Sequence, residues 1–176
     1  MIILVGPVGA GKSVQAQKLV KRLDMQWIST GEMLRSSQDP RIQAKLHSGE
    51  LLDDQDVQEV LETAIKDVES RKDIVMDGFP RRVSQAEWLS GKLPEWEREL
   101  EFVVHIKVDE SEAKERMSLR GRHDDSDDAI KQRNQEYVNQ VLPMVDHYRE
   151  ARVLVEVNGI GTVEEVADRI QEAIGR

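Results

Sequence analysis

The chain opens with an apolar run that leads directly into a glycine-rich loop. Residues 1–5 read Met-Ile-Ile-Leu-Val, and residues 6–13 read Gly-Pro-Val-Gly-Ala-Gly-Lys-Ser. This is the G-x-x-x-x-G-K-S pattern, placed between a predicted strand and a predicted helix. Glycines remove Cβ atoms, so the backbone can point its N–H groups inward at phosphate oxygens, and the following helix directs its positive end to the same place. The segment predicts a phosphate-binding loop; a glycine-rich turn that binds nothing is the alternative.

Five short β-rich runs alternate with longer segments of helical periodicity. The predicted strands are Ile2–Val5, Trp27–Ser29, Ile74–Met76, Phe102–Val108 and Val153–Val157. The predicted helices include Val14–Leu23, Val57–Val68, Glu110–Leu119, Ala129–Tyr148 and Val163–Ile174, with Asp53, Asp56 and Thr162 as candidate N-caps. A further helix is expected after Pro40, in the polar stretch from Ser36 to Gly49. Alternation of this kind predicts an α/β fold: a three-layer α/β/α arrangement around a five-stranded parallel sheet, with ligands at the carboxyl ends of the strands.

Composition restricts the functional class. The 176 residues carry a net charge of −9 and contain no cysteine, which excludes disulfides and thiolate metal sites. An acidic chain is a poor general binder of nucleic acid or membrane surfaces, but a local basic pocket would suffice for a phosphorylated small molecule. No apolar run is long enough to span a membrane, and no signal peptide is evident, so we expect a cytoplasmic protein.

Side chains suited to phosphate and metal chemistry follow the first and third predicted strands. Lys12 is expected to neutralise the β- and γ-phosphates of a nucleoside triphosphate, and Ser13 has the hydroxyl that commonly ligates Mg²⁺ in such loops. Asp77 directly follows the predicted strand Ile74–Met76 and can hold Mg²⁺ or its waters, while Gly78 allows close approach of a ligand. Arg81 can pair with an acceptor phosphate in bidentate fashion. For Ser13 the alternative is a helix-start serine that contacts no metal, and for residues 77–81 it is an ordinary turn at a strand end.

An arginine series lies later in the chain, at Arg116, Arg120, Arg122 and Arg133. Such a series is commonly a solvated surface. Next to a phosphate loop it predicts guanidinium groups that stabilise the charge on a phosphoryl group in transfer. The four histidines show no ligand spacing and the three tryptophans are expected to pack in the interior, so neither set is assigned a role in chemistry.

Taken in this order, the motifs resemble those of the adenylate kinase family of nucleoside monophosphate kinases, over essentially the whole length. The resemblance implies the reaction ATP + AMP ⇌ 2 ADP with Mg²⁺. It implies a single domain over residues 1–176, and a monomer, since members of the family are commonly monomeric. It also implies a monophosphate-binding lobe at residues 29–58 and a vestigial lid at residues 120–130.

The resemblance also implies roles for individual residues. The ATP site would comprise Gly9, Ala10, Gly11, Lys12, Ser13, Val14, Arg116, Arg120 and Gly161. The AMP site would comprise Thr30, Arg35, Glu50, Leu51, Leu52, Gly78, Arg81, Gln85, Arg122 and Arg133, with Thr30 near the base and Gln85 hydrogen-bonded to adenine. Phosphoryl transfer would depend on Lys12, Asp77, Arg81, Arg120, Arg122 and Arg133.

Two departures from the family pattern bear on activity. The phosphate loop reads Lys12-Ser13-Val14 where the family usually has Lys-Gly-Thr, which affects the contacts to Mg²⁺ and the α-phosphate. Only Gly121 separates Arg120 from Arg122, and so short a lid predicts more ATP hydrolysis than in longer-lid relatives. The departures leave open a nucleotide-binding regulatory protein with weakened catalysis. Independently of them, the identity of the acceptor leaves open a UMP/CMP or broad-specificity monophosphate kinase.

Overall fold

A computed structural model describes residues 1–48, 53–69, 72–120 and 127–176. Within these ranges the strands are β1 (Ile2–Val5), β2 (Gln26–Ser29), β3 (Ile74–Asp77), β4 (Phe102–Lys107) and β5 (Leu154–Asn158). The α-helices are α1 (Lys12–Leu23), α2 (Thr30–Ser36), α3 (Pro40–Ser48), α4 (Asp54–Lys66), α5 (Val83–Lys92), α6 (Glu110–Arg120), α7 (Asp127–Glu136), α8 (Leu142–Glu150) and α9 (Val163–Ala173). A 3₁₀ turn (Leu93–Trp96) follows α5, and a π-helical turn (Tyr137–Val141) joins α7 to α8.

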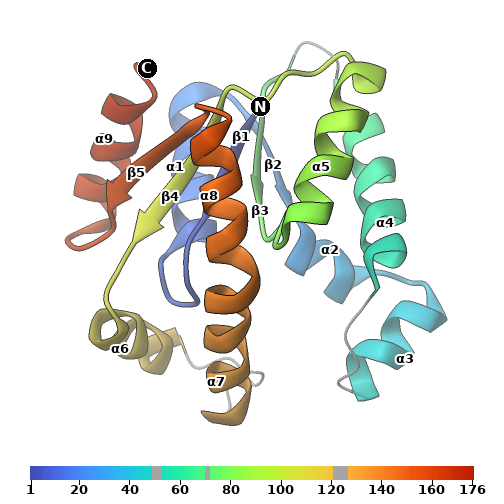
Figure 1. Cartoon of the computed structure of the whole chain (residues 1–176), viewed down its shortest axis with the longest axis horizontal. Helices are drawn as coiled ribbons and strands as arrows, with labels where there is room; N and C mark the ends of the chain where they lie inside the picture. Colours follow the sequence, from blue (N-terminus) through green and yellow to red (C-terminus); the bar gives the residue numbers. More distant parts are fainter. Residues whose placement is uncertain (49–52, 70–71, 121–126) are drawn as a thin grey trace.

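The described strands form one parallel sheet in the order β2-β3-β1-β4-β5. This confirms the predicted five-stranded parallel sheet, with strand ends shifted by one residue at most. The sheet separates two apolar layers, as Figure 1 shows with α5 and α8 in front of it and α1 behind. Residues of α4, α5 and α8 share one cluster with alternate residues of β1, such as Ile3, and α1 and α9 share the other with Ile2 and Leu4.

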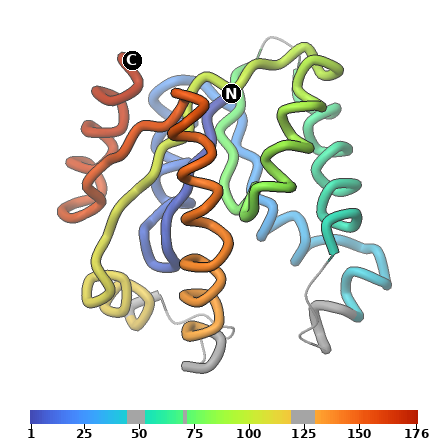
Figure 2. Tube along the Cα trace, in the orientation of Figure 1, coloured from blue at the N-terminus to red at the C-terminus, as the bar shows by residue number. Residues whose placement is uncertain are grey.

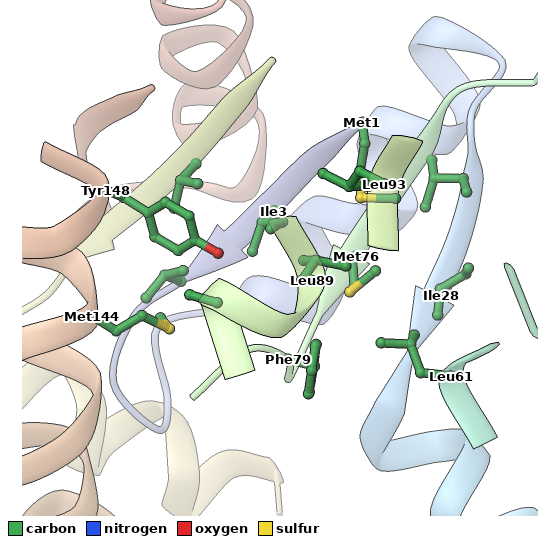
Figure 3. Packing of buried hydrophobic residues seen from close by; sticks show 14 of the residues in the cluster. Met1, Ile3, Ile28, Leu61, Met76, Phe79, Leu89, Leu93, Met144 and Tyr148 are labelled. Atoms are coloured by element: carbon green, nitrogen blue, oxygen red, sulfur yellow. The ribbon is translucent and has the colours of Figure 1, made fainter. Parts of the chain in front are cut away.

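The layer that holds α5 and α8 is built from large side chains (Figure 3). Phe79 and Trp88 meet edge to face with ring centroids 5.9 Å apart, and Trp96 continues the series 5.8 Å from Trp88. Trp88 and Trp96 are half-buried and pack against this cluster, and Trp27 packs against the other, so the prediction that the three tryptophans pack against the core is confirmed. Edge-to-face aromatic pairs add to the free energy that apolar burial already supplies.

Two neighbouring strands send the chain to opposite faces of the sheet. β1 continues into α1 on one face, whereas β3 leads to α5 on the other. Reversal of this kind opens a crevice above the carboxyl ends of the two strands, where open α/β sheets bind their ligands. Both chain termini lie at the opposite end of the sheet (Figure 2). The fold therefore brings the phosphate loop and the segment after Asp77 to the same edge.

Two expectations about secondary structure were wrong. Asp56 is not an N-cap: its N–H donates to Asp53 Oδ1, so Asp53 caps α4 and Asp56 lies in its first turn. The predicted helix Ala129–Tyr148 is divided by the π-helical turn, which lies just before Pro143, a residue without the N–H that the α-helical ladder requires. Helices α2 and α5 were not among the predicted helices, whereas the helix expected after Pro40 is confirmed as α3. The capping role of Thr162 is confirmed, with a complete capping box that includes Glu165. No described helix is both long and apolar enough to cross a membrane.

Candidate active site

In the loop between β1 and α1, the side chain of Lys12 is hydrogen-bonded to backbone carbonyl groups of the same loop. Lys12 Nζ donates to the carbonyl oxygens of Gly6 and Pro7, each at 2.8 Å. Gly11, with φ of 84°, leads into α1, and no described side chain caps this helix, in contrast to α2, α4 and α9. The first-turn N–H groups of α1 therefore have no side-chain cap to compete with an anionic ligand.

Helix α6 packs directly on this loop. Gly9 has φ of 84°, and a Cβ there would lie 2.5 Å from the carbonyl oxygen of Ala113, so only glycine fits. Arg116 of the same helix donates through Nη2 to the carbonyl oxygen of Gly159 at 2.8 Å, and its Nε donates to Glu112 at 2.7 Å. The Arg116 guanidinium thus lies between the phosphate loop and the connection from β5 to α9.

Asp77 is a buried carboxylate with one unused oxygen. Its Oδ1 accepts a hydrogen bond from Ser29 Oγ at 2.9 Å, as their positions opposite each other on β3 and β2 allow. Its Oδ2 is buried and has no hydrogen-bond partner among the described residues, and the residue is only 4% exposed. A buried carboxylate oxygen is costly to leave unpaired, so this oxygen could accept a hydrogen bond from water or hold a cation.

Arg81 lies among other charged side chains. Its Nε donates to the carbonyl oxygen of Gly78 at 2.8 Å. Solvent reaches its side chain, yet the surrounding protein removes enough hydration to lower the pKa of the guanidinium. Arg133 and Arg35 lower that pKa further, while neighbouring carboxylates oppose the shift. Three guanidinium groups at close quarters repel one another, and a bound phosphate would relieve that repulsion.

Glycine is required where the segment after β3 meets α2. A Cβ on Gly78, whose φ is 84°, would lie 2.5 Å from Thr30 Oγ1, and that hydroxyl donates to the carbonyl oxygen of Asp77 at 3.2 Å. Gln85 is 4% exposed: its Oε1 accepts from the Arg81 N–H at 2.8 Å and its Nε2 donates to Asp54 Oδ1 at 2.7 Å.

Comparison with known proteins agrees with this geometry. The family model described as adenylate kinase matches residues 4–153. An adenylate kinase of Phenylobacterium zucineum is 36% identical over 183 aligned positions that cover 98% of this chain and 96% of the relative. Adenylate kinase 1 of a Nostoc strain is 34% identical and covers 99% and 98%, and the adenylate kinase of Clavibacter michiganensis is 33% identical and covers 98% and 92%. The chain belongs to the adenylate kinase family. It is therefore a nucleoside monophosphate kinase, a phosphotransferase.

The structure brings together most of the residues assigned from the resemblance to adenylate kinases. The phosphate-loop residues Gly9, Ala10, Gly11, Lys12, Ser13 and Val14 follow β1. Thr30 is the first residue of α2, which follows β2, and Arg35 lies in its last turn. Gly78, Arg81 and Gln85 follow β3, Arg120 is the last residue of α6, and Gly161 lies between β5 and α9. Glu50, Leu51, Leu52 and Arg122 lie outside the described residues, as does most of the predicted lid.

Two polar contacts near these residues were not predicted from the sequence. Ser29 donates to Asp77, and Asp54 accepts from Gln85. The Ser29–Asp77 contact could have been predicted, because both residues lie at the carboxyl ends of strands, and β2 and β3 are neighbours in the sheet. No local pattern indicated the contact of Asp54, because Asp54 lies 31 residues from Gln85 and the two meet only where the start of α4 approaches α5.

Proposed function

We propose that the chain transfers the γ-phosphoryl group of ATP to AMP, giving two molecules of ADP. The observation that carries this proposal is the placement of two phosphate-binding groups at one edge of the sheet: the Lys12 loop after β1 and the Arg81 group after the adjacent strand β3. A donor polyphosphate on the first group and an acceptor phosphate on the second would meet above the crevice between these strands.

The donor site uses backbone N–H groups and one mobile charge. The N–H groups of the phosphate loop and of the first turn of α1 would bind the β- and γ-phosphates, with Lys12 exchanging its carbonyl contacts for phosphate oxygens. Arg116 and Gly161 would lie beside the nucleoside, where Arg116 already bridges α6 and Gly159. Arg120 would contact the polyphosphate, and Val14, 46% exposed, would lie along it.

The acceptor site is formed by the lobe at residues 29–58 together with the segment after β3. Arg35, Arg81 and Arg133 would clamp the AMP phosphate, and Arg122 would join them. Thr30, Gly78 and Gln85 would surround the base, together with residues 50–52. Charge supports this division, because the cationic cluster lies around Arg81 in a protein of net charge −9.

Phosphoryl transfer needs positioning and charge stabilisation from this chain. An oxygen of the AMP phosphate attacks the γ-phosphorus in line, the bond from that phosphorus to the β,γ-bridging oxygen breaks, and the leaving group is ADP. Lys12, Arg81 and Arg133 would stabilise negative charge on the phosphoryl group in flight. The AMP phosphate is already anionic, so no side chain has to remove a proton from it.

The residues present fit Mg²⁺. Asp77 offers a buried carboxylate oxygen without a partner among the described residues, and Ser13 offers a hydroxyl at the start of α1. Asp77 and Ser13 would hold the ion, Asp77 in part through water. When bound, Mg²⁺ neutralises charge on the β- and γ-phosphates.

A coupled assay tests the proposal and separates the alternatives. Purified protein is given ATP with AMP, CMP, UMP or GMP, with and without Mg²⁺, and ATP loss without acceptor is recorded to test the predicted hydrolysis. We expect Mg²⁺-dependent ADP formation with AMP preferred. Preference for UMP or CMP would favour the pyrimidine kinase, and tight binding of a two-nucleotide bisubstrate mimic without turnover would favour the regulatory protein. We further propose that the protein is cytoplasmic, that its lid at residues 120–130 is vestigial, and that it binds neither nucleic acid nor membranes. We also propose that it is a monomer, and sedimentation with and without nucleotide would test this oligomeric state.

A further inference from the structure

The two ends of the Gln85 side-chain amide have partners of opposite hydrogen-bonding character. The backbone N–H of Arg81 can only donate, and it meets Oε1 at 2.8 Å. The ionised carboxylate of Asp54 can only accept, and it meets Nε2 at 2.7 Å. Because the side chain is 4% exposed, water cannot replace either partner freely.

These partners permit one orientation of the amide. A rotation of 180° would put the NH₂ group against the Arg81 N–H and the carbonyl oxygen against the Asp54 carboxylate, so both hydrogen bonds would become repulsive contacts. The Arg81 N–H is fixed by the backbone, and Asp54 begins α4 next to its N-cap Asp53. Arg82 Nη2 lies 3.5 Å from Asp54 Oδ1 and forms an ion pair with this carboxylate. Asp54 is therefore the side chain on which the orientation depends.

A fixed amide presents a fixed pattern to a ligand. An amide carries two N–H hydrogens and two oxygen lone pairs, and each partner takes one, which leaves one donor and one acceptor in set positions. Adenine offers an amino donor at N6 and an acceptor at N1. Hypoxanthine has the same size and shape, but its O6 accepts and its N1–H donates. An amide that cannot turn pairs with one of these patterns and is mismatched to the other.

Resting on the proposed function, in which Gln85 contacts the acceptor base, we propose that Asp54 is a positioning residue for base specificity. It fixes the Gln85 amide in the orientation that accepts a 6-amino purine and rejects a 6-oxo purine. Without Asp54 only the Arg81 N–H still favours this orientation, so turning the amide to suit a 6-oxo purine breaks one buried hydrogen bond instead of two.

The test compares kcat/KM for AMP and IMP in the wild type and in Asp54→Ala. We expect the IMP-to-AMP ratio to rise about tenfold in this variant, the factor that corresponds to about 1.4 kcal/mol. Asp54→Asn keeps an oxygen that can accept from Nε2, so it should stay within about threefold of the wild-type ratio. Asp53→Ala removes the neighbouring N-cap without touching Gln85 and should leave the ratio unchanged. CMP has adenine's donor and acceptor pattern, so its ratio to AMP should also be unchanged in Asp54→Ala.

The possible outcomes separate the two proposals. Absence of transfer to every monophosphate by the wild type overturns the proposed function. A wild type that prefers AMP, with an unchanged IMP-to-AMP ratio in Asp54→Ala, overturns the role of Asp54 alone. A measurement on the wild type covers the case in which Asp54→Ala does not fold: in the NMR spectrum of the AMP complex, one Gln85 Nε2 proton should exchange slowly with solvent. Fast exchange of both protons would overturn the proposal.

Discussion

His105 Nε2 lies 2.7 Å from the hydroxyl oxygen of Tyr137, and this contact ties the sheet to the helix that carries Arg133. His105 is a buried residue of β4, 4% exposed, while Tyr137 begins the π-helical turn one helical turn after Arg133. On the other side of the ring, Nδ1 lies 3.4 Å from Glu156 Oε1. A carboxylate there favours a proton on Nδ1, so Nε2 is the acceptor and the Tyr137 hydroxyl donates to it.

Tyr137→Phe removes that donor and leaves His105 Nε2 buried without it. We expect the free energy of unfolding to fall by about 1–3 kcal/mol, the cost of a buried group that loses its partner. Urea unfolding measures this. Val138→Ala is the matched control, because Val138 is the next residue and is 58% exposed, so a change under about 0.5 kcal/mol is expected. Equal stability of Tyr137→Phe and the wild type would show that the contact contributes nothing.

Burial lowers the pKa of His105, and this makes the stability of the protein depend on pH. Glu156 opposes the shift, Lys107 and Arg149 add to it, and the Tyr137 hydroxyl stays protonated because burial raises its pKa to about 12. Since the unfolded chain takes up a proton near pH 6.5 and the folded protein does so only at lower pH, stability falls as pH decreases from about 6.5 towards the folded pKa.

Replacing this histidine should therefore flatten the pH profile. In His105→Gln, the difference in free energy of unfolding between pH 7.5 and pH 5.5 should be smaller than in the wild type, and urea titrations at the two pH values measure it. Parallel profiles for variant and wild type would assign the acid sensitivity to other groups.

Arg81→Ala and Lys12→Ala should abolish most turnover while the fold survives. Each removes a cation proposed to stabilise the transferring phosphoryl group, and losses of such groups cost about 10³-fold in kcat. Arg81 is desolvated and surrounded in part by Arg133 and Arg35, so its removal should change unfolding free energy by under about 1 kcal/mol. Lys66→Ala, at a lysine 63% exposed on α4, serves as the control that keeps activity. Near-normal kcat in either active-site variant would refute the role of that residue.

The sequence predicted what local patterns determine. β-branched runs such as Ile2–Val5 need apolar surroundings on both faces, and the loop ending at Lys12 needs its glycines, so the sheet and the phosphate site were predictable. Helix α5 was missed because its apolar periodicity is weak and its last turn contains a glycine, Gly91. Contacts between distant positions, such as Asp54 with Gln85, depend on tertiary packing and leave no mark in local spacing.

Gly78 and Gly91 provide a pair of substitutions with opposite expected signs. At Gly78 a Cβ would meet Thr30 Oγ1 at 2.5 Å with φ of 84°, whereas no described atom lies within 4 Å of a Cβ at Gly91 in α5. Gly78→Ala should lower the free energy of unfolding by about 2 kcal/mol or more, since a strained backbone and a collision add. Gly91→Ala should raise it by about 0.5–1 kcal/mol, because alanine favours a helix interior.

A second substitution separates strain from collision at Gly78. Thr30→Ala in the Gly78→Ala background removes Oγ1 and should recover the part of the loss that comes from the collision, leaving the cost of the left-handed backbone. Thermal or urea unfolding of the double variant, compared with each single variant, measures this coupling. If the losses of the two single variants simply add, Thr30 and Gly78 do not meet as the structure shows, and the close packing of α2 against the segment after β3 is refuted with them.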